Sequence, residues 1–283
     1  MRQFFGLLIS LLIFSSLSFA QKEAATTANP EGQSTTTITA PSGFLGQPSI
    51  MSGWKSYTDS GRPEQVATPG DRQFISKNEF FLGVRNQAGY GLYGQIRQDV
   101  KNFSPGGKNV TGIYANDPSV SFMHPIYSTD RFKIAGLARQ YFPGSAHSVS
   151  ENIYHTAYYL NFLNELKGGY DLFNQFTSRY FSATNYTPTD GVFYEEFTTT
   201  LSKRLNETVR LGIGQQTQLE THNDIPVGKT VELFPYADFN FTKTIFAGPR
   251  IYVPVAVQNY VYDAPKAVSF NNIQAELYFQ ATL

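Results

Sequence analysis

The last stretch of the chain, Ala267 to Leu283, ends in a strict alternation of apolar and polar residues. The apolar positions are Ile273, Ala275, Leu277, Phe279, Ala281 and Leu283, and the polar or amphipathic positions are Asn272, Gln274, Glu276, Tyr278, Gln280 and Thr282. A period of two is that of a β-strand with one apolar and one polar face. Strands of soluble sheets have about 5–6 residues, whereas a strand tilted across a bilayer needs about 9–11. The pattern therefore predicts a membrane-spanning strand, and we expect it to pair with a strand near the N-terminus, because that pairing leaves no open edge.

This terminal strand resembles the end of bacterial outer-membrane β-barrels, whose chains commonly finish on such a strand and usually on an aromatic residue. Here the last residue is Leu283, and the nearest aromatic residue is Phe279. The resemblance implies an all-β fold, an antiparallel transmembrane β-barrel integral to the outer membrane of a Gram-negative bacterium. It also implies outer-membrane lipid and the barrel-insertion machinery as partners.

The N-terminal part of the chain has a different pattern. Residues 1–20 have the features of a secretory signal peptide: a basic start at Arg2, an apolar core from Phe4 to Phe14, and a small-residue cleavage site ending at Ala20. Residues 21–42 are rich in Thr, Ala and polar residues and have no periodicity, which predicts a flexible leader. Residues 43–283 are then expected to form the barrel.

Eleven alternating runs predict the strands of this barrel. They are Lys77–Asn86, Tyr90–Asp99, Val120–Tyr127, Arg131–Phe142, Thr156–Glu165, Tyr170–Phe181, Val192–Leu205, Val209–Thr221, Thr230–Phe241, Ile245–Gln258 and Ala267–Leu283. Bacterial barrels have an even number of strands. The weak pattern of Gly43–Tyr57 is the candidate for one more strand at the start, which gives about twelve.

The connections between these runs alternate between short and long, as in barrels with short periplasmic turns and long external loops. Three of the long connections, Lys101–Pro118, Pro143–Asn152 and His222–Lys229, are predicted to be loops. Proline removes a hydrogen bond from the ladder between strands. Bulges or shortened strands are therefore expected at Pro235, Pro249 and Pro254.

The composition excludes several classes of function. The 22 basic and 22 acidic residues balance, so no excess charge favours nucleic acid as a partner. The sequence has no cysteine, which excludes disulfides and thiolate metal sites. No metal-ligand spacing, P-loop or dinucleotide-binding motif is found, and we expect no metal and no cofactor.

No catalytic motif is found either, and we predict that the protein is not an enzyme. The His-x-Ser-Asn-Gly run of outer-membrane phospholipases has its nearest counterpart in His147-Ser148, which lacks the spacing and the Asn-Gly. His222-Asn223-Asp224 is similar to the Asp/His rim of outer-membrane proteases, but ordinary loop residues explain it better. A surface hydrolase is therefore the third candidate function.

The charged residues predicted to face inward are the candidate functional site. The residues predicted to line the lumen are Arg85, Arg97, Arg139, Arg179, Arg210, Asp238, Arg250 and Glu276. Basic side chains predominate on the early strands, where Lys77, Arg131 and Lys133 add to them, and acidic ones such as Glu232 are prominent on the late strands. Opposed basic and acidic walls would set up a transverse field that orients polar solutes.

This arrangement predicts passive diffusion of small polar solutes through a narrow charged lumen. The alternative is a closed barrel whose charges form structural salt bridges, and which acts as a structural or surface-interaction module through its external loops. Barrels of eight strands are filled by side chains and those of sixteen leave a wide channel, so a count of twelve does not decide between the two.

Overall fold

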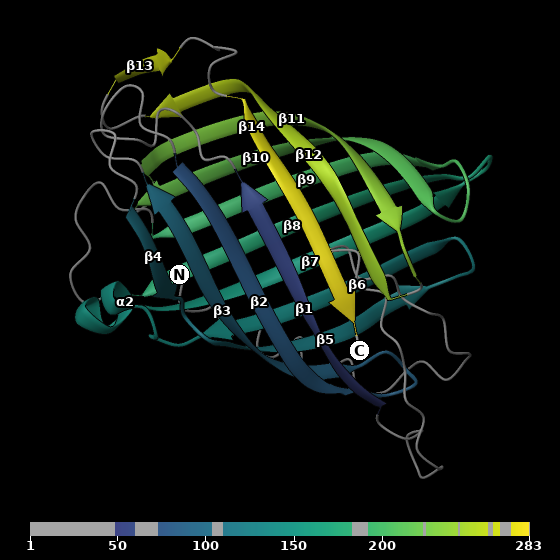
Figure 1. Ribbon diagram of the computed structural model, residues 1–283, viewed down its shortest axis with the longest axis horizontal. Coiled ribbons are helices and arrows are strands. Elements are labelled where there is room, and N and C mark those ends of the chain that lie inside the picture. The colour runs from purple at the N-terminus through teal and green to yellow at the C-terminus, as the bar shows by residue number, and fades with distance from the viewer. Residues whose placement is uncertain are drawn as a thin grey trace.

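The computed structural model describes residues 49–59, 73–103, 110–182, 192–222, 225–242, 244–259, 263–266 and 273–282. Within these ranges twelve antiparallel strands form a closed barrel (Figure 1). Its strands are β1 (Ser49–Asp59), β2 (Gln73–Arg85), β3 (Gly91–Phe103), β5 (Ser119–Ser128), β6 (Phe132–Tyr141), β7 (Tyr154–Leu166), β8 (Tyr170–Ser182), β9 (Phe193–Arg204), β10 (Val209–His222), β11 (Ile225–Asn240), β12 (Ile245–Asn259) and β14 (Gln274–Thr282). The predicted fold class and strand number are confirmed.

The barrel closes as the terminal pattern predicts. Strand β14 pairs with β1 from Gly53 opposite Thr282 to Asp59 opposite Glu276, and on its other side it pairs with β12. The weak segment Gly43–Tyr57 does contain the first strand, although that strand runs from Ser49 to Asp59. Residues 43–48, the predicted signal peptide and the predicted leader lie outside the described residues.

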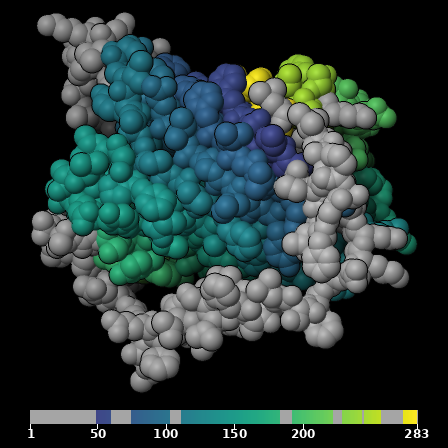
Figure 2. Space-filling view, turned by 90° about the horizontal axis from the view of Figure 1, so that it is seen from below, coloured from purple at the N-terminus to yellow at the C-terminus, as the bar shows by residue number. Residues whose placement is uncertain are grey.

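The two faces of the wall differ as a membrane barrel requires. On β14, Leu277 is 55% exposed on the outside, whereas its neighbour Tyr278 is 1% exposed on the inside. The same alternation leaves large apolar side chains on the outer face of the other strands, among them Leu82, Ile96, Phe197, Leu211 and Ile251. Figure 2 shows one side of this outer surface, where the side chains of the early strands, coloured purple to blue, form a continuous cover.

Inside the barrel, an apolar cluster lines the wall formed by the early strands. It consists of Met51, Phe81, Tyr93, Met123, Leu137, Ala157 and Tyr159, with Tyr141 packed against it. These residues come from six successive strands of the ring, β1, β2, β3, β5, β6 and β7. The cluster packs along the inner face of this half of the wall, and polar residues of the lumen lie on the same face.

Short turns join the strands at one end of the barrel, and local chemistry explains three of them. Gly168 and Gly169 have φ values of 80° and 75°, the left-handed region that a tight hairpin turn needs and that glycine adopts without steric cost. The Asn206 side chain accepts hydrogen bonds from the backbone N–H groups of Thr208 and Val209. The Thr242 hydroxyl accepts one from the N–H of Ile245 in the same way.

Additional elements lie at the opposite end of the barrel, away from the C-terminus (Figure 1). Strand β4 (Val110–Ala115) pairs with the end of β3, and β13 (Asp263–Lys266) pairs with the end of β12. A short helix, α2 (Ala146–Glu151), lies between β6 and β7. In the described part of the chain, no helix is long and apolar enough to span a membrane.

Two of the predicted loops are wrong. Strand β3 continues to Phe103 and forms a hairpin with β4, so Lys101–Pro118 is partly strand. Most of His222–Lys229 belongs to β10 and β11, which pair as far as His222 opposite Ile225. The glycine and proline of His222–Lys229 are typical of a loop. The ladder nevertheless continues past Pro226, because a register shift at this point accommodates a residue that cannot donate a backbone hydrogen bond.

The three prolines at which a bulge or a shortened strand was expected behave differently from one another. A register shift lies at Val231/Glu232, where Glu232 is opposite Pro254, as expected for a bulge. Pro235 and Pro249 keep the regular register, opposite Ile213 and Leu277. Neither strand is shortened, since β11 has 16 residues and β12 has 15. The expectation of a bulge is therefore confirmed at Pro254 and wrong at the other two.

Candidate functional site

All eight residues of the predicted lumen lie on strand positions that face the interior of the barrel. Arg139, for example, lies on β6 two residues from Leu137 of the inner cluster, and Glu276 lies on β14 two residues from Tyr278. The strands β6 and β12 are six places apart in the ring in either direction. Arg139 and Arg250 therefore lie on opposite sides of the barrel.

The expected separation into a basic wall and an acidic wall is wrong. Arg97 binds Asp99 of its own strand, with Nε 2.8 Å from Oδ1 and Nη2 3.0 Å from Oδ2. Arg250 on β12 lies 3.7 Å from the carboxylate of Glu276 on β14. Opposite charges are thus neighbours within one wall. Arg97 and Asp99 are two residues apart on the same face of one strand, whereas Arg250 and Glu276 face each other across two paired strands.

Two further basic residues of the early strands follow the same rule. Lys77 forms an ion pair of 3.2 Å with Asp59, and Lys133 forms one of 3.3 Å with Glu165. Neither acid was included in the predicted lumen. Arg131, which was expected to face inward on a strand, lies exposed in the turn before β6 and belongs to no wall.

A third group of charges lies toward the short-turn end, on β8 to β11. Arg210 and Arg204 lie 3.5 Å and 3.9 Å from Asp171. Arg210 is also directly opposite Asp238 in the ladder. On its other side β11 pairs with β12, where Tyr236 is opposite Arg250, so Asp238 lies diagonally across from Arg250 on the same inner face.

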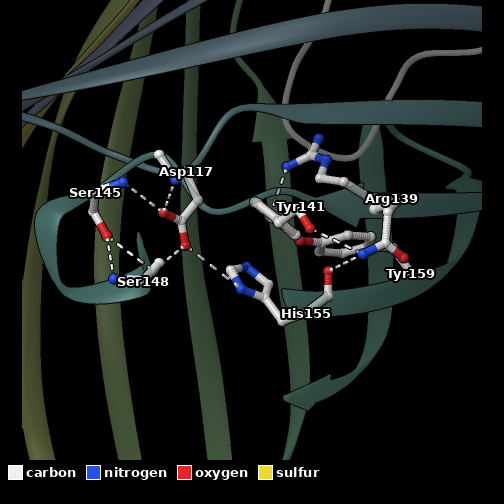
Figure 3. A network of polar contacts seen from close by, with 9 residues as sticks. Asp117, Arg139, Tyr141, Ser145, Ser148, His155 and Tyr159 are labelled. Carbon is white, nitrogen blue, oxygen red and sulfur yellow. Dashed lines mark hydrogen bonds and ion pairs between the residues drawn. The ribbon is translucent and has the colours of Figure 1, made fainter. Parts of the chain in front are cut away.

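Arg139 is the centre of a hydrogen-bonded group on the early half of the wall (Figure 3). Its guanidinium donates to the Ser121 hydroxyl at 2.8 Å, to the Tyr93 hydroxyl at 3.1 Å and to the Tyr141 hydroxyl at 3.2 Å. The Tyr141 and Tyr159 hydroxyls are 3.2 Å apart. The group joins β3, β5, β6 and β7 and orders the side chains around one buried cation.

Arg179 on β8 extends this group along the wall. Its Nη2 donates to the Tyr159 hydroxyl at 3.3 Å. The guanidinium carbon lies 5.6 Å from the centre of the Tyr141 ring and 5.5 Å from that of Tyr194, both within the range of cation–π attraction. The Tyr194 hydroxyl donates to Glu196 at 2.6 Å. Two arginines and four tyrosines, Tyr93, Tyr141, Tyr159 and Tyr194, thus form what we call the arginine–tyrosine wall.

The sequence analysis missed the tyrosines of this wall. The hydrogen bond between Arg139 and Tyr93 joins residues 46 positions apart, and the pattern of a single strand does not predict such a contact. The available signal was parity: Tyr141 lies two residues after Arg139, so both face the same side of β6.

A separate polar network lies above this wall and holds the segment that contains α2 (Figure 3). Asp117 accepts hydrogen bonds from the backbone N–H groups of Gly144 and Ser145, at 3.0 Å and 2.9 Å, and from the Ser148 hydroxyl at 2.6 Å. His155 Nδ1 lies 3.9 Å from the same carboxylate. Burial raises the pKa of Asp117, but the hydrogen bonds outweigh it and hold the pKa below its ordinary value.

This network does not have the geometry of a serine hydrolase. In a hydrolase the histidine accepts the proton of the serine, whereas here the Ser148 hydroxyl donates to Asp117. Among the residues with described positions, no group of His, Asp and Glu side chains could hold a metal ion. Asn223 and Asp224 of the other hydrolase candidate lie outside those positions.

The comparison with solved structures supports the fold through one outer-membrane channel. No family profile matches the sequence, and no curated protein is significantly similar to it. An outer-membrane channel from Pseudomonas putida F1 superposes with a TM-score of 0.60 at 9% identity, covering 83% of this chain and 95% of that one. The KdgM porin, solved with oligogalacturonate, gives 0.47 at 7% identity over 82% and 98%, and the NanC porin gives 0.48 at 9% identity over 82% and 98%.

The closed ring, its apolar outer face and the shared fold together indicate where in the cell envelope the protein lies. A barrel without edges satisfies every ladder hydrogen bond, and an apolar exterior matches the lipid that surrounds it. The chain is an integral β-barrel of the outer membrane.

Proposed function

We propose that this barrel lets small polar solutes cross the outer membrane by passive diffusion. The observation that supports the proposal is the inner wall, where Arg85, Arg97, Arg139, Arg179, Arg210, Asp238, Arg250 and Glu276 all occupy inward positions of a closed ring. A barrel that served only as a membrane anchor would have no use for so many ionised groups inside a low-dielectric wall, because each costs desolvation energy.

The pairing of the charges suggests how a polar solute would interact with the inner wall. Arg97 with Asp99 and Arg250 with Glu276 present both signs at short range. A polar solute that loses part of its hydration shell would exchange those hydrogen bonds for bonds to such pairs. Because neither sign predominates along the whole wall, the lumen would discriminate weakly between small cations and anions.

A second candidate is a closed barrel that acts through its external segments. The observation in its favour is burial: Lys55 and Asp59 are each 2% exposed, and Arg139 is 5% exposed, although all three face inward. In this case β4, α2 and β13, which lie together at one end of the barrel, would carry the function. Conductance distinguishes the two candidates.

The test is the current through the purified protein in a planar bilayer. We expect discrete ion-conducting steps from the full mature chain, or from a variant that lacks residues 21–41 if the predicted leader closes the lumen. A shift in mobility between unboiled and boiled samples on an SDS gel serves as the control for folding. Silence of both folded forms would overturn the channel proposal and favour the closed barrel.

A further inference from the structure

We infer that Arg179 is a binding site for small carboxylate anions within the lumen. This inference rests on the proposed channel function and names the class of solute that the arginine–tyrosine wall would retain.

Within the part of the chain that the structure describes, most of the hydrogen-bond donors of Arg179 have no partner. A guanidinium has five N–H groups. Across the described residues, Arg179 makes one hydrogen bond, to Tyr159, and no ion pair, and its buried Nε has no partner. Arg97 differs because two of its nitrogens bind Asp99, and Arg250 differs because it pairs with Glu276. Arg97 and Arg250 are thus paired with carboxylates, whereas no carboxylate among the described residues pairs with Arg179.

The guanidinium is also held in a fixed place. The rings of Tyr141 and Tyr194 lie 5.6 Å and 5.5 Å from its centre, and the Tyr159 hydroxyl accepts from Nη2. Tyr194 is directly opposite Arg179 in the ladder between β8 and β9, so the two side chains share one face of the sheet. A cation held in this way loses little rotamer freedom when it binds an anion, which favours binding.

Few carboxylates on the neighbouring strands would repel an anion bound at Arg179. The inward positions of β5 to β8 carry two carboxylates, Glu165 and Asp171, and both lie at the short-turn end and pair with basic residues there. Glu196 on β9 accepts hydrogen bonds from Tyr194, Thr198 and Gln218, and Glu220 on β10 lies opposite Tyr194, on the side of Tyr194 away from Arg179. The part of the wall around Arg179 is thus basic and rich in hydroxyl groups.

These features define the ligand chemistry. The planar fork of a guanidinium matches the two oxygens of a carboxylate. The hydroxyls of Tyr141 and Tyr159, 3.2 Å apart beside Arg179, can donate to or accept from hydroxyl groups of the same solute. A small hydroxylated carboxylate such as gluconate fits both requirements, whereas sorbitol offers the hydroxyls without the anionic group.

The experiment compares these two solutes in two independent measurements. Isothermal titration calorimetry on the folded barrel in detergent measures binding, and block of the KCl current in a planar bilayer measures occupancy of the lumen. We expect gluconate to bind and block and sorbitol to do neither. We expect Arg179→Gln to weaken gluconate binding by about tenfold or more, the loss typical of a charged hydrogen-bond partner. Lys203→Gln is the matched control, because Lys203 lies on the outer face over the ring of Tyr170.

The outcomes separate this inference from the channel proposal. Gluconate binding that depends on Arg179 in a barrel without conductance would overturn the channel and leave the site in place. A conducting barrel in which gluconate binds no better than sorbitol, or in which Arg179→Gln and Lys203→Gln behave alike, would overturn the carboxylate site. The charge-conserving Arg179→Lys variant should keep part of the binding, because the ammonium retains the charge but loses the two-pronged geometry.

Discussion

Single side chains on the two faces of one strand meet different surroundings. Leu211 on β10 is 45% exposed on the outer face, whereas Gln216, five residues later on the same strand, occupies an inward position opposite Glu232. The odd spacing places the two on opposite sides of the wall. The consequences of adding a charge should therefore differ between them.

We expect Leu211→Arg to lower the free energy of unfolding by roughly 2–4 kcal/mol if the position lies near the bilayer midplane. Gln216→Arg is the control, and it should change stability little because the new cation faces the carboxylate of Glu232. Urea titration of the protein in lipid vesicles measures both. Equal losses for the two variants would mean that the assignment of the faces is wrong.

Two glycines in strands, Gly248 and Gly94, differ in the space that a Cβ atom would have at each position. A Cβ on Gly248 would overlap the backbone carbonyl of Ala237 on β11, which cannot move without breaking the ladder. A Cβ on Gly94 would meet the carbonyl oxygen of Leu82 at 4.0 Å, an ordinary contact.

Gly248→Ala should therefore destabilise the barrel by about 1–3 kcal/mol, the usual cost of overpacking. Gly94→Ala should leave stability unchanged or raise it slightly, because alanine restricts the unfolded chain more than glycine does. The same urea titration compares the two, and a Gly248→Ala barrel as stable as the Gly94→Ala one would contradict the close packing of β11 on β12.

At the scale of elements, the segment that contains α2 depends on one carboxylate from another part of the chain. Asp117 accepts hydrogen bonds from Gly144, Ser145 and Ser148, and Ser145 also caps the first turn of α2. The pKa of Asp117 is held below its ordinary value, so its stabilising effect is complete at pH values above that ordinary pKa. The effect is lost as the pH falls through the lowered pKa, where the carboxylate is protonated.

Hydrogen exchange at the backbone amides of Gly144 and Ser145, corrected for intrinsic rates, should reveal this dependence. We expect exchange to be slow at neutral pH and to accelerate once Asp117 is protonated. Asp117→Asn should accelerate it at neutral pH by about tenfold and remove the pH dependence, because the charge-assisted bonds are lost. Ser150→Ala, which removes a local bond to the His147 carbonyl, should leave both amides unchanged. Pronounced pH dependence that persists in Asp117→Asn would assign the effect to another group.

Elements that cross the lipid were predicted well, and those beyond it were not. The alternation of Glu276, Leu277 and Tyr278 predicts β14 because a wall between lipid and lumen requires that period. Strand β4 and the extended start of β11 were taken for loops, since outside the membrane neither face has to be apolar and glycine and proline dominate the pattern. There the structure is set by continuation of the ladder rather than by the sequence period.

At the scale of the whole molecule, closure determines which charges become neighbours. The sequence identifies Arg250 and Glu276 as inward residues, but their separation of 3.7 Å follows from β14 pairing with β12. The side of each residue could be predicted from parity, whereas the ion pairs between strands and the arginine–tyrosine wall could not, because they depend on register between strands. The expected opposed walls are for this reason replaced by local pairs.

Selectivity follows from these pairs, since removing one partner leaves the other charge in the lumen. Loss of Arg97 would leave Asp99 without its bidentate partner, and loss of Glu276 would leave Arg250 without its ion-pair partner on β14. A charge beside a low-dielectric wall acts strongly on ions that pass it. We therefore expect the wild-type channel to have weak selectivity that each set of changes shifts in a defined direction.

Replacing Arg97 and Arg139 with Gln should make the conductance severalfold more selective for cations, because the negative groups that remain attract them. Replacing Asp238 with Asn and Glu276 with Gln should shift it toward anions for the converse reason. The reversal potential under a KCl gradient measures both shifts, and Lys203→Gln, on the outer face, should have no effect. Because Debye screening weakens with dilution, the shifts should be larger at low salt. Shifts of the same sign for the two sets would mean that these residues do not line the path of the ions, even in a barrel that conducts.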